Sequence, residues 1–308
     1  MNKTQNGLGR YAVHEASLKG NVQMLKAMLP YIDDINKVDN NQQTAAHVAA
    51  KFDELESLKI LYANGINLEL PDKFGVQVAH IAAQQNHTDI IEFLFEIGIS
   101  FNTGCNLGKI SFHYAAEYGS FESLKILSKY YVDISITDND QNTAAHLAAK
   151  NDHLNCVQYL IKLGLPIDIV RNNHGRNVAH VCCLSGSLKT LHWLLENGID
   201  INAVDGFGNN LAANCCLNGQ GECFNCCVQH DVPVDLLNNL DETPLDIARK
   251  CGKGYHIEKS AINQIRCSYC VENAIKIKIE KESTSQMAVP KSQEKKASAK
   301  PTTKRWNR

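Results

Sequence analysis

Six histidines recur along the chain at an interval of 33 residues, with 34 before the last one. They are His14, His47, His80, His113, His146 and His180. Imidazole groups can bind metals or transfer protons, so a shared reactive centre is the first chemistry to consider. Packed neighbouring helices lie about 8–10 Å apart, however, so equivalent side chains of successive units cannot all reach one ion at a bond length of about 2 Å. We therefore predict a structural role for these histidines.

The twelve cysteines are the second group that could do chemistry. Two Cys-x-x-Cys pairs have the residue types of a tetrahedral zinc site. They are Cys223 with Cys226 and Cys267 with Cys270. Five of the twelve cysteines nevertheless fall at positions of the interval that hold Ala or Leu in other units, namely Cys182, Cys183, Cys215, Cys216 and Cys227. Buried Cys behaves as a small hydrophobic residue. We predict core packing with no metal and no cofactor; a zinc-binding module or a redox pair is the alternative. A disulfide between Cys182 and Cys215 is disfavoured, because it requires Cα atoms closer than about 7 Å.

Motifs of catalysis and nucleotide binding are missing from the sequence. It contains no Gly-rich phosphate loop, nucleophile elbow or paired catalytic motif. The pair Gly206 and Gly208 is interpreted as a turn of the repeat. We predict that the chain is not an enzyme.

Charge is distributed unevenly and limits the classes of partner. Residues 276–308 contain ten Lys or Arg and three Glu, whereas the preceding residues contain 21 Lys or Arg and 30 Asp or Glu. An acidic body is poorly suited to phosphate backbones, so we expect no nucleic-acid binding by it. No apolar segment approaches the ~20 residues of a membrane helix, and the first residues lack the apolar stretch of a signal peptide. We expect a monomeric cytoplasmic protein with reduced thiols and no membrane contact; nuclear import through the basic tail is the alternative.

The residue types around the histidines recur at the same interval. A Gly, Gln or Asp lies five positions before each interval position, and a Gly, Asp or Asn lies six after it. In the second unit, Thr44 can cap a helix that begins with Ala45, and the leucines of residues 55–61 predict a second helix with one apolar face. A fixed period of this length is typical of a solenoid, in which each unit buries its apolar face only by stacking on a neighbour.

The segments Thr44-Ala45-Ala46-His47 and Thr143-Ala144-Ala145-His146 resemble the Thr-Pro-Leu-His opening of the ankyrin repeat. Thr243-Pro244-Leu245-Asp246 keeps the Pro and Leu but lacks the His. The paired alanines, the Gly after the first helix and the leucine-rich second helix closed by Gly agree with that family as well. The resemblance implies an all-α solenoid of helix–turn–helix units with projecting hairpin loops, in which the periodic histidines hydrogen-bond the helix start and the adjacent repeat.

The period sets the expected boundaries. Repeats one to eight are expected at 6–38, 39–71, 72–104, 105–137, 138–171, 172–204, 205–237 and 238–266. A leader at 1–5, a C-terminal extension at 267–282 and a disordered basic tail at 283–308 complete the chain. Repeat seven is the least regular, because Ala213 replaces the histidine and Gly219 and Gly221 loosen the entry to its second helix. Repeat eight is expected to cap the stack.

The resemblance implies a non-enzymatic scaffold or adaptor that binds partner proteins on a concave face made of loop tips and first helices. The variable positions of that face are Phe52, Phe74, Gln84, Leu107, Lys109, Tyr118, Asn139, Asp140, Arg171, His174, Arg176, Phe207 and Leu217. Aromatic residues in polar turns suggest a protein partner. For Phe74 and Phe207, folding back onto their own hairpins is the alternative. The basic residues favour a partner segment with apolar and acidic side chains.

Two further expectations come from the family. Asn202 fits its hydroxylation pattern, with Leu194 eight residues earlier. A ubiquitin-ligase substrate receptor is the rival function, but the SOCS box that such receptors carry has Leu four residues before a Cys. Asn263 and Arg266 stand four residues before Cys267 and Cys270, so the motif does not match.

Overall fold

The computed structural model describes residues 5–130, 133–253, 257, 267 and 269–271. The chain divides into two units, 1–267 and 268–308, and the repeats lie in the first. Among the described residues the regular structure is entirely helical. The leader up to residue 4, residues 258–266, the alternating segment 274–279 and the basic tail 283–308 lie outside the described residues.

Seven of the expected repeats contain a pair of short helices, and the described part of the eighth contains one helix. In repeats one to four these are α1 (Ala12–Leu18), α2 (Val22–Met28), α3 (Ala45–Lys51), α4 (Leu55–Ala63), α5 (Val78–Gln84), α6 (Thr88–Glu96), α7 (Ser111–Glu117) and α8 (Phe121–Lys129). In repeats five to eight they are α9 (Ala144–Lys150), α10 (Leu154–Lys162), α11 (Val178–Ser185), α12 (Leu188–Glu196), α13 (Leu211–Asn218), α14 (Gly221–Gln229) and α15 (Pro244–Lys250). A 3-10 turn, η1 (Leu29–Tyr31), follows α2.

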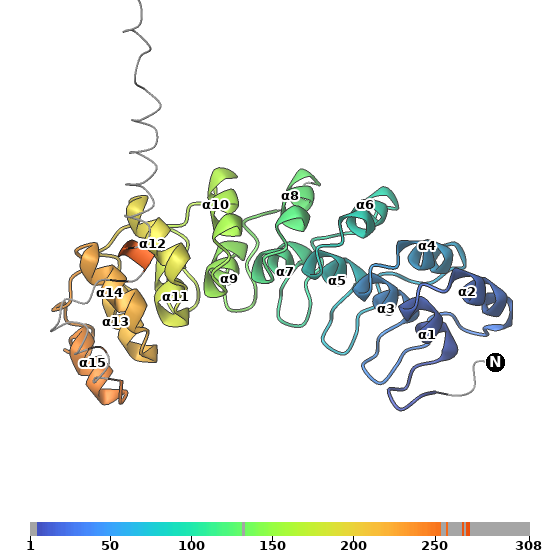
Figure 1. Ribbon diagram of the computed structural model, residues 1–308, viewed down its shortest axis with the longest axis horizontal. Helices are drawn as coiled ribbons and strands as arrows, with labels where there is room; N and C mark the ends of the chain where they lie inside the picture. The colour runs from blue at the N-terminus through green and yellow to red at the C-terminus, as the bar shows by residue number, and fades with distance from the viewer. Residues whose placement is uncertain (1–4, 131–132, 254–256, 258–266, 268, 272–308) are drawn as a thin grey trace, which may run out of the picture. The chain divides into compact units, whose positions relative to one another are not determined.

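The pairs stack in chain order within the first unit (Figure 1). The odd-numbered first helices contact one another successively, because their alanines leave little side chain between the backbones. Ala46, Ala79 and Ala145 are all fully or almost fully buried. The second helices bury one apolar face against them, as Leu58 and Leu61 do in α4. The fold is an ankyrin-type solenoid, because each apolar face is covered by the next repeat.

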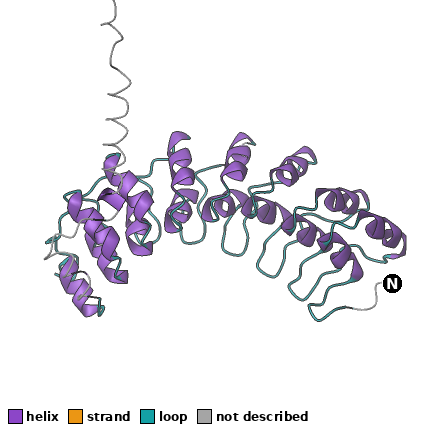
Figure 2. Ribbon diagram, viewed as in Figure 1, coloured by secondary structure: helices purple, strands orange, loops and turns teal. Residues whose placement is uncertain are grey.

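The loops between consecutive repeats project from one side of the stack (Figure 2). Asp39 closes the first of these hairpins, since its Oδ1 accepts the backbone N–H groups of Asn41 and Gln43 at 2.8 and 3.0 Å. The same two bonds recur in the later hairpins at Asp72, Asp138, Asn172, Asp205 and Asn238. Neighbouring hairpins are also joined, for example by the N–H of Lys73 and the carbonyl of Asn41 at 3.1 Å. The loop tips are therefore held at regular positions.

The interval histidines connect each first helix with the next hairpin. His47 Nδ1 accepts the N–H of Thr44 at 3.1 Å, and its Nε2 donates to the carbonyl of Val76 at 3.1 Å. Three others make both kinds of bond: His14, His80 and His146. His113 and His180 bond only the helix start among the described residues. Burial lowers the pKa of all six, which favours the neutral ring that can accept at one nitrogen and donate at the other.

In the described part of the chain, no helix is long and apolar enough to cross a membrane. The longest helices of the repeats have nine residues, as in α6 and α12.

Candidate functional site

Large apolar side chains stand exposed at the tips of the hairpins. One position of the repeat holds Leu8, Asn41, Phe74, Leu107, Asp140, His174, Phe207 and Leu240 in successive hairpins. The five apolar members expose 57, 60, 59, 52 and 70% of their surface in chain order. We call these eight side chains the tip surface. Because contiguous exposed apolar patches often mark interaction sites, the tip surface is the candidate site for a contact with another molecule.

The alternative in which Phe74 and Phe207 fold back into their hairpins does not fit their exposure. Lys73 Nζ lies 4.9 Å from the Phe74 ring centre. Phe207 stacks on His174 of the preceding hairpin at 6.2 Å, and the Arg176 guanidinium lies 5.9 Å from the same ring. These contacts orient the rings without covering them.

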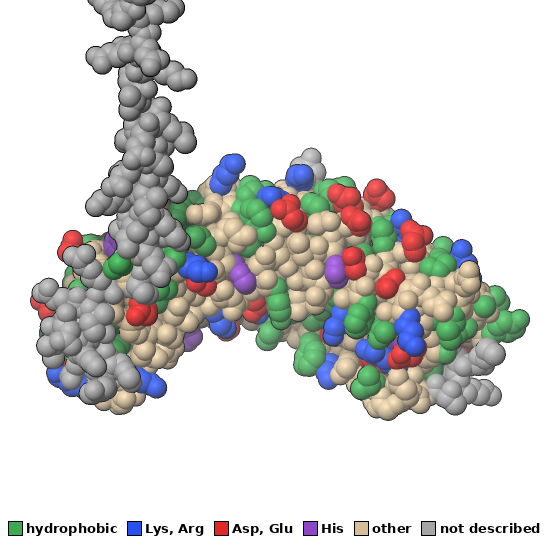
Figure 3. Space-filling view, viewed as in Figure 1, with side chains coloured by type: hydrophobic (Ala, Val, Ile, Leu, Met, Phe, Trp, Pro, Cys, Tyr) green, Lys and Arg blue, Asp and Glu red, His purple; other side chains and the backbone are tan. Residues whose placement is uncertain are grey.

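Two further aromatic residues predicted for this site lie at the ends of first helices. Phe52 caps α3 and Tyr118 caps α7, and both are exposed. They extend the apolar area from the tips to the first helices. Figure 3 shows hydrophobic side chains along the side of the stack from which the hairpins project.

The three basic residues that the sequence assigns to partner binding, Lys109, Arg171 and Arg176, bond groups within the protein. Lys109 forms an ion pair of 2.7 Å with Glu117, and only 15% of its side chain is exposed. Arg176 pairs with the buried Asp205 at 3.4 Å. Arg171 donates to the carbonyls of Gly175 and Val204 at 3.3 and 3.4 Å. These contacts connect hairpins and first helices, so the three side chains have a structural role in the described part of the chain.

The remaining predicted residues divide between structure and surface. Asn139 is exposed but bridges two hairpins, since its Nδ2 donates to the carbonyl of Asn106 at 3.0 Å. Asp140 is exposed at a tip, whereas Gln84 and Leu217 are half-buried at the ends of first helices. Asn202 is exposed, and its N–H donates to Asp200 Oδ1 at 2.9 Å.

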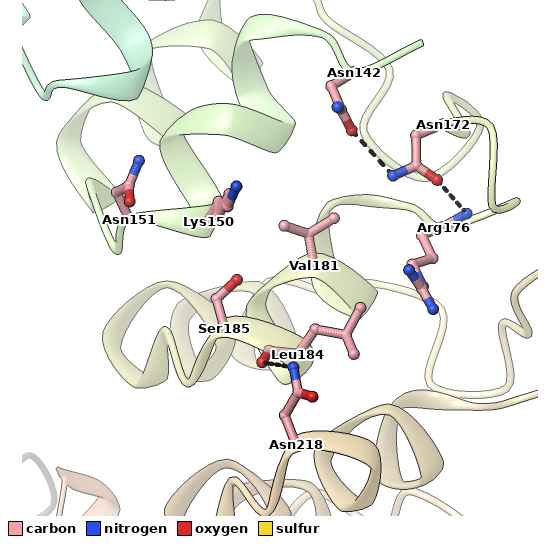
Figure 4. A pocket seen from close by; sticks show the side chains of 9 residues that line it. All are labelled: Asn142, Lys150, Asn151, Asn172, Arg176, Val181, Leu184, Ser185 and Asn218. Carbon is pink, nitrogen blue, oxygen red and sulfur yellow. Dashed lines mark hydrogen bonds between the residues drawn. The ribbon is translucent and has the colours of Figure 1, made fainter. Parts of the chain in front are cut away.

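A polar pocket of about 460 Å³ lies beside α9, α11 and α13 (Figure 4). It is lined by Asn142, Lys150, Asn151, Asn172, Arg176, Val181, Leu184, Ser185 and Asn218. Asn142 Oδ1 accepts from Asn172 Nδ2 at 3.0 Å, and Asn218 Nδ2 donates to the Leu184 carbonyl at 2.9 Å. Lys150 is exposed at the end of α9. The pocket thus offers amide groups and a cation next to the hairpins.

Sequence reasoning missed two of the apolar members of the tip surface, Leu8 and Leu240. Both stand at the same repeat position as Phe74, so aligning the hairpins would have found them. It also missed most of the pocket, because the lining residues are polar and come from three repeats.

Cysteines and histidines form two groups of potential metal ligands in the described part of the chain. Within residues 1–267 the first group contains His192, Cys226 and His230, and the second contains Cys183, Cys215 and Cys227. Cys223 and Cys267, two of the four cysteines that the sequence singled out, belong to neither group. Cys182 and Cys215 are separate buried thiols. Burial raises the pKa of Cys182, Cys183 and Cys215, so these thiols stay protonated.

Comparison with known proteins agrees with this geometry. The family model described as "Ankyrin repeats (3 copies)" matches residues 1–72, 67–138 and 113–205. The chain is an ankyrin-repeat protein. The matched ranges cover well over half of its length, and the helix pairs and hairpins continue beyond them to α15.

Curated relatives share only part of the chain. Ankyrin repeat domain-containing protein 37 of Xenopus tropicalis is 28% identical over 93 residues, which are 30% of this chain and 57% of the relative. The Homo sapiens protein of the same name is 26% identical over 95 residues, which are 31% of this chain and 60% of the relative. The chain therefore matches less than two thirds of the length of these relatives.

A solved structure supports the fold. The human ASB11 ankyrin repeat domain aligns with a TM-score of 0.59 and 20% identity, over 70% of this chain and 96% of the other. This similarity concerns the architecture alone. Ankyrin repeats are protein–protein interaction modules, so the family and the exposed tips point to the same class of function.

Proposed function

We propose that this ankyrin-repeat protein is a non-enzymatic adaptor that binds a partner protein through the tip surface and the adjoining polar pocket. The row of exposed apolar tips carries the proposal, because water disfavours such a surface and the hairpin bonds hold it at fixed spacing. A hairpin backbone that is already ordered loses little conformational entropy on binding, which favours affinity.

The geometry suggests the chemistry of the partner. Neighbouring repeats are separated by about 10 Å, the distance between packed helices, and a polyproline II segment advances about 3.1 Å per residue with about three residues per turn. One partner side chain in three would therefore face a new hairpin. We expect an extended segment with apolar residues at about that spacing, whose backbone amides reach the asparagines of the pocket and whose acidic group reaches Lys150. The paired Lys109, Arg171 and Arg176 contribute rigidity.

Affinity purification tests the proposal with two variants, a triple substitution in the tip surface and a double substitution on the second helices as its control. Phe74→Ser with Leu107→Ser and Phe207→Ser removes the apolar tips without touching the core. The control, Tyr62→Ser with Phe95→Ser, removes exposed aromatic residues of comparable size from the second helices. We expect the tip variant to lose the specific partners of the wild type and the control to retain them. Identical partner sets for the tip variant and the wild type would contradict the proposal.

A further inference from the structure

Repeats six and seven place metal-ligating groups opposite each other on their second helices. His192 and Glu196 are one helical turn apart on α12. Cys226 lies on α14, and His230 follows one turn later as its C-terminal cap. Residues four apart in a helix share a face, so each helix presents its two groups together.

The distances between the ligand atoms fit one tetrahedral ion. His192 Nδ1 lies 3.4 Å from His230 Nε2 and 3.9 Å from Cys226 Sγ, and all three atoms lie within 4.8 Å of one another. Zinc bonds of about 2.0–2.1 Å to nitrogen and 2.3 Å to sulfur at tetrahedral angles separate two nitrogens by about 3.3 Å, and nitrogen from sulfur by about 3.5 Å. A shift of a few tenths of an ångström would complete the geometry.

A carboxylate stands where zinc sites commonly have one. The other ring nitrogen of His192, Nε2, lies 3.1 Å from Glu196 Oε1. Histidine ligands usually bond a carboxylate or carbonyl through their second nitrogen, which fixes the ring and its tautomer.

Packing alone does not account for these residues. The position of the repeat that His192 occupies holds Lys59, Glu92, Lys125 and Gln158 in repeats two to five. The position of Cys226 holds the larger Ile60, Phe93, Ile126, Tyr159 and Trp193. Repeat seven therefore has a thiol where repeats two to six have a larger apolar side chain, and this thiol faces the imidazole of His192 in repeat six.

The second group, Cys183, Cys215 and Cys227, is a poorer site. Each of its thiols is fully buried, and three thiolates with Zn²⁺ would leave a negative charge in the core. Burying a net charge without a partner is costly. Two imidazoles and one thiolate leave a single positive charge beside Glu196, and the half-buried His230 gives access from solvent.

We propose that His192, Cys226 and His230 bind one zinc ion that joins α12 to α14. The ion takes two nitrogens and one sulfur from the protein, which leaves one tetrahedral position for a further ligand. It fastens repeat seven, whose second helix has cysteines in place of larger apolar residues, to the regular repeat six. The sequence alone favours no metal, and its alternative is a zinc site of four cysteines; the proposed site shares Cys226 with that alternative.

Metal analysis of the full chain tests the site. After expression with zinc and exhaustive dialysis, we expect one zinc per chain in the wild type and in Cys223→Ser, a matched control on the same helix that lies outside the group. Cys226→Ser, His192→Gln and His230→Gln should lose it. Co²⁺ in place of zinc should give tetrahedral absorption bands with a sulfur charge-transfer band, and Cys226→Ser should abolish the latter.

The melting temperature adds an independent measurement. A chelator should lower it in the wild type and in Cys223→Ser but leave His230→Gln unchanged, and His230 is half-buried, so this variant should retain the fold. Failure of the wild type to retain zinc would overturn the proposal and leave an ordinary hydrogen bond between His192 and His230. Zinc that survives in His192→Gln and His230→Gln but disappears in Cys183→Ser would assign the ion to the three-thiol group and overturn it equally.

Discussion

The residues at the interval position differ in the hydrogen bonds that they make along this chain. The interval histidines bond the start of their own helix through Nδ1 and, in four of the six, the next hairpin through Nε2. In repeat seven the interval position is Ala213, and the N-cap residue Asn210 both caps the helix and bonds the following loop. Asn210 Oδ1 accepts the N–H of Ala213 at 3.0 Å, while its Nδ2 donates to the carbonyl of Pro233 at 2.6 Å.

The buried histidines predict that acid weakens the fold well before the carboxylates titrate. Burial lowers the pKa of His80, His146 and His180 to about 4 from an unfolded value of 6.5. Between these values the unfolded chain binds more protons, so the stability is complete above pH 6.5 and falls as the pH decreases toward 4. Each histidine should contribute on the order of 1–2 kcal/mol to this loss by pH 5. Urea denaturation of metal-free protein at pH 7.5, 6 and 5 measures it, and equal midpoints at all three would contradict the account.

Two glycines allow the cost of backbone strain to be measured separately from the cost of a clash between a new Cβ atom and the next hairpin. Gly98 and Gly175 have φ values of +81° and +68°, where a side chain is strained. A Cβ at Gly98 would meet nothing within 4 Å, whereas one at Gly175 would lie 2.5 Å from the backbone nitrogen of Gly206 in the next hairpin. We expect Gly98→Ala to lower the free energy of unfolding by about 1 kcal/mol and Gly175→Ala by at least about 1 kcal/mol more. Denaturant titration decides this, and equal losses would show that hairpins do not constrain each other.

The sequence predicted residues well where the period alone determines their environment. Histidines, capping residues and small core residues recur at 33-residue spacing, so their roles follow from the repeat. Lys109 was predicted as a binding residue because it lies in a variable hairpin position. The reversal of the chain brings it to Glu117 on the following helix, and no periodic signal encodes that ion pair.

At the scale of elements, repeat seven has a first helix that is bonded to its hairpin and a second helix with small side chains. Asn214 is fully buried in α13 and donates to Asp205 Oδ2 at 3.2 Å, which ties the helix to its hairpin. In α14, by contrast, Cys227 occupies the position of Leu61, Leu94, Leu127 and Leu194 in other repeats. Smaller side chains bury less apolar surface, so the interface of this helix contributes less to stability.

We expect repeat seven to open before the central repeats. In a linear stack the stability is a sum of unit and interface contributions, so a weak unit opens locally and releases the repeat beyond it. Amide exchange of the metal-free protein should show residues 205–266 losing protection faster than residues 72–171. Zinc should reduce the difference by joining α12 to α14. Uniform protection in the metal-free protein would mean that the cysteine-rich helix packs as well as a leucine-rich one.

The zinc ligands show what the sequence could not indicate directly. The two Cys-x-x-Cys pairs drew attention because they are close in sequence. His192 and His230 lie outside the 33-residue series of histidines and become neighbours of Cys226 only through the stacking of second helices. Placing every second helix in one register would have shown a histidine opposite a cysteine, but only after the fold was known.

At the scale of the whole molecule, the 33-residue period places one tip side chain on each successive hairpin at regular spacing. Backbone bonds between hairpins and the histidine bonds behind them restrict the tips, while the exposed apolar side chains provide the contact area. A partner that follows this row would gain a small contribution from each repeat. Removal of several tips should therefore weaken binding in steps and leave the stability of the stack almost unchanged.

The most direct test of the account is the dissociation constant of a purified partner, measured by calorimetry against the wild type and the two surface variants. We predict that Phe74→Ser with Leu107→Ser and Phe207→Ser weakens binding at least about tenfold, equivalent to about 1.4 kcal/mol. The control, Tyr62→Ser with Phe95→Ser, should bind as the wild type does. An unchanged dissociation constant for the tip variant, or a larger loss in the control, would contradict the assignment of the hairpin tips as the recognition surface.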